Sequence, residues 1–255
     1  MLLHMKRILH LLMLCSASLG TVYISAQQTS RTPSSVVPFI GCPSDGQVGP
    51  IAAPTGHPKR VKLPSAIAAR FAYYKGDDSL GVLAPRGWQC FSTYGSNGSS
   101  LFVAPLLPPH KSFFSGSWKG FSGSVIQISN MDGGTSGRFS VAETIARVFP
   151  THRAFAQQVL DEHLGLDKLP SGPYPTDVLH YRSPEVVEYT TPPNTDGLGT
   201  QTRLLKNGTP ITGVEILQTE EPNAISLAVR LSADTSDLAP FIIRDVEQNN
   251  PPDAK

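Results

Sequence analysis

The chain has 255 residues, of which 40% are hydrophobic and 16% charged, and its formal net charge is +1. This hydrophobic fraction excludes a wholly disordered chain, and the near-zero charge argues against a protein that binds nucleic acid through a basic surface. The 22 glycines and 23 prolines exceed one residue in six, against roughly 12% in an average protein, so turns and short strands are expected rather than a helical bundle.

The first 26 residues have the order of features of a secretory signal peptide. Lys6 and Arg7 precede an apolar run over 8–16, and small residues follow up to Ala26. The run is shorter than the ~20 apolar residues of a spanning helix, so cleavage is expected rather than a membrane anchor. Lipid attachment at Cys15 is a third reading. We therefore expect an exported protein, periplasmic or extracellular, with no membrane span in the mature chain.

Residues 27–35 are polar and rich in Ser and Thr, which predicts a flexible leader. A single α+β domain is expected over 36–247, with a sub-boundary near 105–123 as an alternative, and a loose tail over 248–255. A helix is predicted over 64–74, where Ile67, Phe71 and Tyr74 share one face. Strands separated by turns are predicted next, over 80–84, 88–93, 100–104 and 125–128.

Cys42 and Cys90 are the only cysteines after residue 26. An even number of cysteines in an exported chain predicts a disulfide bond. The other reading makes one of them a nucleophile with a partner histidine, but neither lies in a recognisable catalytic signature.

The strongest helix signal lies over 140–164. Ser140 and Glu143 have the spacing of a capping box, in which each side chain bonds the other residue's backbone N–H. Pro150 divides the segment, so a central two-part helix is predicted, ending before Gly165.

The rest of the chain is predicted to be mostly β, with a short helix over 236–246. The expected strands are 178–182, 186–191, a hairpin over 204–211 that turns at Asn207-Gly208, and a second hairpin made by 214–219 and 224–232. In the last strand hydrophobic residues alternate with Ser226, Ala228 and Arg230, which predicts an antiparallel strand with one face in solvent.

Local motifs for the common chemistries are missing. The glycine-rich segment 132–140 lies before a predicted helix, but it lacks the motifs of phosphate and dinucleotide loops, and Glu143 would repel an anion there. The segments around Ser122 and Ser136 miss the Gly-x-Ser-x-Gly spacing of hydrolases. His152 and His163 would lie about 16 Å apart on one helix, too far to share a metal ion. No cofactor and no metal are therefore expected, while carboxylates distant in sequence stay open as catalytic groups.

The aromatic-rich stretch before residue 123 is the best candidate for a binding surface, through Phe113, Phe114, Trp118 and Phe121. Exported modules that bind carbohydrates or peptides often present aromatic rings as flat apolar platforms. The alternative is that these rings fill the core of a loop-rich fold.

Three short phrases resemble a group of exported bacterial proteins with no assigned activity: Phe-Ile-Gly-Cys-Pro at 39–43, Gly-Trp-Gln-Cys-Phe-Ser-Thr-Tyr-Gly at 87–95 and Gly-Leu-Gly-Thr at 197–200. The resemblance extends over most of the chain after residue 26. It implies bacterial export and transfers no activity to this chain.

The sequence thus predicts an exported, loop-rich α+β protein with a mainly antiparallel sheet and one disulfide. The first functional hypothesis is a non-catalytic envelope or extracellular protein that binds a small ligand or a protein partner. The second is a secreted hydrolase whose site is dispersed in sequence. A cleft with two carboxylates, or a Ser–His pair within hydrogen-bond reach, would favour the hydrolase, and a closed core with a flat aromatic patch would favour the binding protein.

Overall fold

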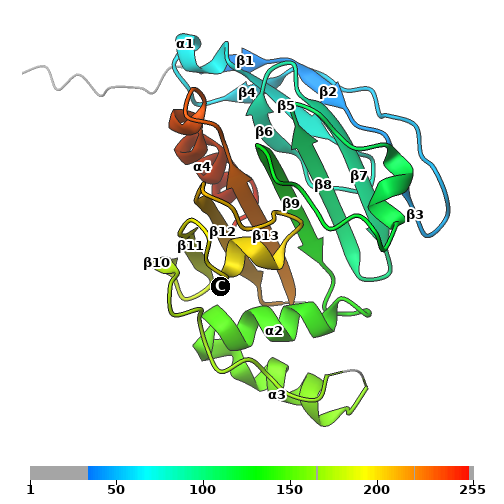
Figure 1. Cartoon of the computed structure of the whole chain (residues 1–255), viewed down its shortest axis with the longest axis vertical. Helices are drawn as coiled ribbons and strands as arrows, with labels where there is room; N and C mark the ends of the chain where they lie inside the picture. The colour runs from blue at the N-terminus through cyan, green and yellow to red at the C-terminus, as the bar shows by residue number, and fades with distance from the viewer. Residues whose placement is uncertain (1–33, 165, 221, 253–255) are drawn as a thin grey trace, which may run out of the picture. The chain divides into compact units, whose positions relative to one another are not determined.

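The computed structural model describes residues 34–252 except 165 and 221 (Figure 1). The predicted signal peptide and most of the predicted leader lie outside these residues. Within them the chain is α+β, as expected, with mostly antiparallel strands. None of the described helices is both long enough and apolar enough to cross a membrane.

An eight-stranded sheet forms the centre of the fold, in the order β10-β11-β12-β13-β9-β8-β7-β3. Every neighbouring pair is antiparallel except β3 and β7, which are parallel. The strands are β3 (Ser44–Gly46), β7 (Gln89–Gly95), β8 (Gly98–Ala104), β9 (Val125–Met131), β10 (Val178–Ser183), β11 (Val186–Thr191), β12 (Ile211–Gln218) and β13 (Asn223–Arg230).

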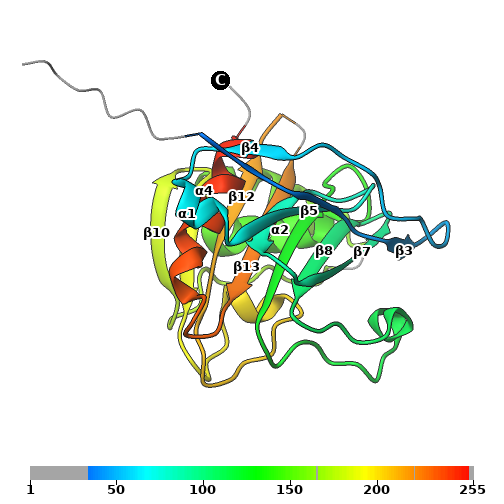
Figure 2. The same ribbon diagram turned by 90° about the horizontal axis from the view of Figure 1, so that it is seen from above.

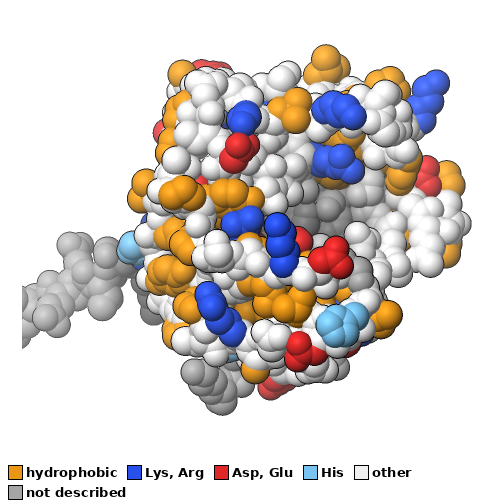
Figure 3. All heavy atoms as spheres, turned by 60° about the horizontal axis from the view of Figure 1, so that its bottom comes forward, with side chains coloured by type: hydrophobic (Ala, Val, Ile, Leu, Met, Phe, Trp, Pro, Cys, Tyr) orange, Lys and Arg blue, Asp and Glu red, His pale blue; other side chains and the backbone are white. Residues whose placement is uncertain are grey.

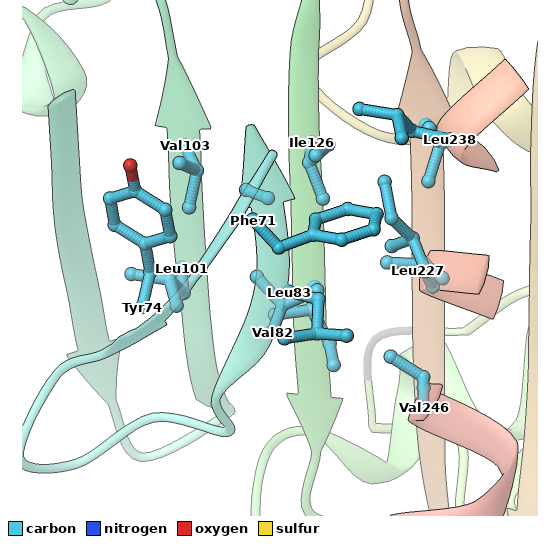
Figure 4. Packing of buried hydrophobic residues seen from close by; sticks show 14 of the residues in the cluster. Phe71, Tyr74, Val82, Leu83, Leu101, Val103, Ile126, Leu227, Leu238 and Val246 are labelled. Atoms are coloured by element: carbon cyan, nitrogen blue, oxygen red, sulfur yellow. The ribbon is translucent and has the colours of Figure 1, made fainter. Parts of the chain in front are cut away.

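One face of this sheet carries a smaller sheet and a helix. The smaller sheet consists of β2 (Phe39–Gly41), β5 (Phe71–Lys75) and β6 (Val82–Pro85), and the helix is α4 (Ala239–Asn249), preceded by the 3-10 turn η4 (Ser236–Leu238). The short helix α1 (Ser65–Ala68) and the paired strands β1 (Ser35–Val37) and β4 (Lys59–Val61) adjoin them. Figure 4 shows the ring of Phe71 between Ile126, Leu227 and Val246, so this core joins both sheets to α4.

The opposite face is covered by α2 (Arg138–Val148), α3 (Arg153–Asp161) and the 3-10 turns η1 (His110–Phe114), η2 (Pro150–His152) and η3 (Leu198–Gln201). Figure 2 shows the small sheet and the segment around η1 on opposite sides of β7 and β8. The inner strands of the central sheet are therefore covered on both faces, and each face has its own hydrophobic core, whereas the edge strand β10 is largely exposed.

The predicted disulfide is confirmed. Cys42 follows β2, Cys90 lies in β7, and their sulfur atoms are bonded. Because β2 belongs to the small sheet and β7 to the large one, the bond crosslinks the two sheets.

The helix predicted over 64–74 is wrong beyond its first turn. Only Ser65–Ala68 is helical, and Phe71–Lys75 is the central strand of the small sheet. Strand pairing with β2 and β6, together with the strand preference of aromatic residues, outweighs the helical spacing of three apolar side chains.

The hairpin predicted at Asn207-Gly208 is also wrong, because β12 begins only at Ile211. The Asn207 side chain instead donates to the carbonyl oxygen of Ser122 and accepts from the N–H of Thr209 at 2.8 Å. The turn residue thus ties two loops together rather than joining two strands.

The central two-part helix is present with different ends. α2 starts at Arg138, so Ser140 is inside the first turn and makes no capping box with Glu143. The preceding turn starts the helix instead, since the N–H of Arg138 donates to the carbonyl oxygen of Thr135. α4 continues to Asn249, so the tail begins later than residue 248.

Candidate functional site

The polar face of β13 is buried, contrary to the expectation that it faces solvent. Ser226 is 8% exposed, Ala228 0% and Arg230 2%. Alternation shows that a strand has two chemically different faces, but what covers each face is decided by the rest of the chain. Here α2 and two loops cover the face that carries the polar residues.

Five polar side chains form a row across five adjacent strands on this face, and we call them the polar row. The register pairs each with the next: β7 with β8, β8 with β9, β9 with β13 and β13 with β12. Directly paired residues of antiparallel strands project from the same face of the sheet. The polar row consists of Thr93, Ser100, Ser129, Ser226 and Glu215.

Hydrogen bonds join members of the polar row. The hydroxyl oxygens of Ser100 and Ser129 are 2.7 Å apart, and the Ser226 hydroxyl donates to Glu215 Oε1 at 2.7 Å. Gln127 extends this polar floor, because its Nε2 donates to the Ser129 hydroxyl at 3.1 Å and its Oε1 accepts from the N–H of Arg203 at 2.8 Å.

Glu215 is the one carboxyl group of the polar row, and burial changes its chemistry. It is 4% exposed, and burial raises its pKa to about 8, although the hydrogen bond from Ser226 acts in the opposite direction. Its second oxygen, Oε2, has no hydrogen-bond partner among the described residues. At neutral pH the side chain is therefore protonated, and it can both donate and accept a hydrogen bond.

Two adjoining cavities lie over the polar row. The smaller, of about 190 Å³, lies between Glu215 and α2, with Glu143 and Arg147 among its lining residues. The larger, of about 390 Å³, lies over Ser100 and continues to the aromatic segment. Both are lined by Gln127, Ser129, Met131 and Ser140, so they adjoin, and together we call them the polar groove. Figure 3, in which the bottom of Figure 1 comes forward, shows a hollowed face with Lys or Arg (blue) and Asp or Glu (red) side chains at the edge of the hollow.

The four predicted aromatic residues do not form a flat exposed platform. Phe113 and Phe121 are each 7% exposed and pack beneath Phe102, whose ring centroid is 5.0 Å from that of Phe113. Phe114 is 53% exposed, and Trp118 is half-buried. Phe113, Phe114 and Trp118 line the larger cavity, so the segment forms a wall of the polar groove.

Arg230 fixes the loops that border this wall. Its buried guanidinium donates to the carbonyl oxygens of Gly123 at 3.0 Å, Phe121 at 2.6 Å and Leu205, and burial lowers its pKa. An arginine at the end of β13 thus holds the segments around residues 121 and 205 together.

Two amides of the glycine-rich loop before α2 are already occupied by side-chain oxygens of the chain itself. The N–H of Gly133 donates to Asn223 Oδ1 at 2.9 Å, and the N–H of Gly134 donates to Asp132 Oδ1 at 2.8 Å. Glu143 lies beyond the first turn of α2, and not beside this loop as the capping-box spacing predicted. The described residues contain no group of three or more His, Cys, Asp or Glu side chains able to hold a metal ion.

Sequence reasoning missed the polar row, although one signal for it existed. Glu215 is a lone charged residue in an apolar strand, and the predicted hairpin of 214–219 with 224–232 places it near Ser226. The contributions of Ser100 and Ser129 had no such signal, since β8 and β9 join the hairpin through pairing distant in sequence.

No protein-family model, curated protein or solved structure matches the chain.

Proposed function

We propose that this protein is an exported, non-catalytic binding protein whose ligand is a small hydroxyl-rich molecule of the carbohydrate class, held in the polar groove. The observation that carries the proposal is the polar row, which ends in a buried Glu215 with an unpartnered oxygen at a cavity. An unsatisfied buried polar atom costs about 1–3 kcal/mol, and a ligand hydroxyl on Oε2 would remove that cost.

The floor of the groove favours hydroxyl groups as ligand atoms. β8, β9, β13 and β12 are inner strands, each paired on both sides, so their backbone cannot add a peptide strand. The polar row and Gln127 offer hydroxyl, amide and carboxyl groups to the cavities, and sugar hydroxyls both donate and accept as these groups require. The half-buried Trp118 at the wall offers an apolar surface to the less polar face of a sugar ring.

Two observations support export. The order of charge, apolar run and small residues at the N-terminus is that of a signal peptide, and the disulfide bond is typical of oxidising compartments.

Calorimetric titration of the oxidised protein with a panel of neutral and acidic mono- and oligosaccharides tests the binding function. We expect at least one saccharide to bind, and Ser129→Ala to weaken it about five- to tenfold, because one hydrogen-bonding group at the centre of the floor is lost. Ser65→Ala, on exposed α1, is the matched control and should leave the affinity unchanged. Absence of binding across the panel, or equal affinity in Ser129→Ala and the parent protein, would overturn the proposal.

The groove also supports a second candidate, a glycoside hydrolase. Glu215 and Glu143 line the same small cavity, the first buried and the second exposed on α2, and glycoside hydrolysis uses two carboxyl groups in different environments. Chromatography of an oligosaccharide after incubation distinguishes the two. Shortened products that disappear in Glu215→Gln and Glu143→Gln would establish the hydrolase, and binding without products would establish the binding protein.

A further inference from the structure

The carboxyl groups of the polar groove lie at one end, and Arg203 and Lys119 lie at the other. Both carboxyl groups, Glu143 and Glu215, line the smaller cavity. The larger cavity and the adjoining hollow at the aromatic end, of about 390 Å³, have no Asp or Glu among their lining residues, whereas Arg203 lines both and Lys119 lines the hollow. The aromatic end of the groove is therefore positively charged.

Arg203 and Lys119 are brought together by the backbone. The N–H of Phe121 donates to the carbonyl oxygen of Arg203 at 2.7 Å, and Phe121 forms a parallel bridge with Leu204. Gly120, at φ +140°, permits this approach, since a Cβ there would lie 2.3 Å from the Arg203 carbonyl oxygen. The two cationic residues thus belong to adjacent segments at a fixed separation of their backbones.

Arg203 is held at its backbone on both sides. The backbone N–H of Arg203 donates to Gln127 Oε1 at 2.8 Å, and its carbonyl oxygen accepts a hydrogen bond from the N–H of Phe121. Its guanidinium lies 5.7 Å from the Trp118 ring centroid. A guanidinium that extends from an anchored backbone loses less freedom on binding than one on a mobile loop.

Neither cation is neutralised within the described part of the chain. The ion pairs between described residues all involve basic residues other than Arg203 and Lys119. Among the described residues, Lys119 Nζ donates only to the carbonyl oxygen of Gly116, at 2.9 Å. Arg147, at the other end of the groove, is instead occupied, since it stacks 3.9 Å from the Tyr174 ring centroid and donates to the Gly172 carbonyl oxygen.

We propose that the aromatic end of the polar groove binds the carboxylate of an acidic sugar, a uronic acid unit, through Arg203 and Lys119. The inference rests on the proposed binding function and adds a specificity to it. The guanidinium has a planar fork of donors that matches a carboxylate, and Trp118 beside it offers an apolar surface to the sugar ring. The remaining units of the saccharide then extend over the polar row.

The test compares a uronic acid trisaccharide with its methyl ester by calorimetry at low salt. The ester has nearly the same size and hydroxyl groups but no charge. We expect the acid to bind at least tenfold more tightly than the ester, and added salt to reduce this ratio. Acetate and inorganic phosphate, titrated separately, should bind far more weakly than the trisaccharide, because they lack the hydroxyl groups that meet the polar row.

Variants identify the cations. Arg203→Gln and Lys119→Met should each weaken the acid about tenfold and leave the ester unchanged. Lys111→Met is the control, because Lys111 is exposed on the neighbouring η1 turn and lines neither cavity.

The outcomes separate this inference from the function on which it rests. Equal affinity for acid and ester, or an equal loss for both in Arg203→Gln, would overturn the acidic-sugar specificity while leaving the saccharide-binding function in place. Phosphate binding as tight as the trisaccharide would replace it with a simple anion site. Absence of binding by the acid, the ester and every neutral saccharide would overturn both.

Discussion

A carboxyl group in the middle of a sheet is costly to ionise, and Glu215 sits where two sheet neighbours and α2 exclude water from it. Burial favours its neutral form by raising its pKa, and the Ser226 hydroxyl donates a hydrogen bond to one of its two oxygens. The other oxygen is the one that the proposed ligand would reach. The chemistry at this end of the groove therefore depends on whether Glu215 is protonated.

This protonation equilibrium predicts a pH-dependent stability. The pKa of Glu215 is about 8 in the folded chain, against an ordinary 4.5, so unfolding releases a proton between these values. The contribution of Glu215 to stability is full below about pH 4.5 and is lost as the pH rises through about 8. Its slope is at most about 1.4 kcal/mol per pH unit.

Urea unfolding at several pH values between 5 and 9 measures this effect. Glu215→Gln keeps the shape and the hydrogen bond from Ser226 but has no proton to release, so the parent should lose stability relative to the variant as the pH rises. Other titrating groups contribute equally to both proteins. Parallel stability profiles for the two would show that Glu215 is ionised in the folded chain at neutral pH.

We expect substitution of Arg230 to lower the stability of the fold strongly. Arg230→Met leaves three carbonyl oxygens, on Phe121, Gly123 and Leu205, without their donor, and we expect the free energy of unfolding to fall by about 3–5 kcal/mol. Chemical unfolding at neutral pH measures the change. The free energy of unfolding of Arg60→Met, at an exposed position, should stay within about 0.5 kcal/mol of the parent value. A similarly small change for Arg230→Met would show that Arg230 does not hold the two loops together.

At the scale of elements, the short N-terminal strands explain why a covalent bond between the two sheets stabilises the fold. The N-terminal strands are short, and β2 and β3 each have three residues, too few to hold their positions by pairing alone. The Cys42–Cys90 bond fixes the junction between them to β7.

The bond closes a loop with a sequence separation of 48 residues. For a loop of this length the chain-entropy estimate is about 4 kcal/mol, so Cys42→Ser and Cys90→Ser should each lower the melting temperature strongly and by similar amounts. The double variant should be no less stable than either single one, because the bond is already lost. Thiol titration of unfolded, unreduced protein that lacks residues 1–26, and with them Cys15, should find no free thiol, and one reactive thiol per chain would contradict the result.

At the scale of the whole molecule, the central sheet joins two cores that lie on opposite faces. The described residues form one compact unit, and the same strands, such as β9 and β13, contribute side chains to both cores. Loss of one core therefore removes the support of the other, which predicts a single cooperative unfolding transition.

Substitutions in the two covering helices test this cooperativity. Ile145→Ala in α2 and Ile242→Ala in α4 each empty a buried position and should cost about 2–5 kcal/mol. Each should move one common transition, followed by calorimetry and by near- and far-ultraviolet circular dichroism. A separate early transition in either variant would mean that the two layers unfold independently.

The local sequence pattern was sufficient to predict most strands and the disulfide bond. The hairpin of β12 and β13, the strands β7 to β11 and the disulfide follow from alternation, turn residues and an even cysteine count, because these depend on neighbouring residues or on counting alone. Where the pattern misled, at 64–74 and at Asn207, pairing with distant strands or loops outweighed the local preference.

The polar groove was decided by the tertiary structure. Alternation in β13 correctly separated Ser226 and Arg230 from their hydrophobic neighbours, but the cover that α2 and the loops place over them depends on contacts distant in sequence. The same cover removes Glu215 from water and raises its pKa, and the pairing of β9 with β13 brings Ser129 beside Ser226. The sequence by itself determined which side chains are polar and on which strand face each lies. Only the fold decided that these faces meet in one buried row, because burial and register between distant strands are properties of the assembled sheet.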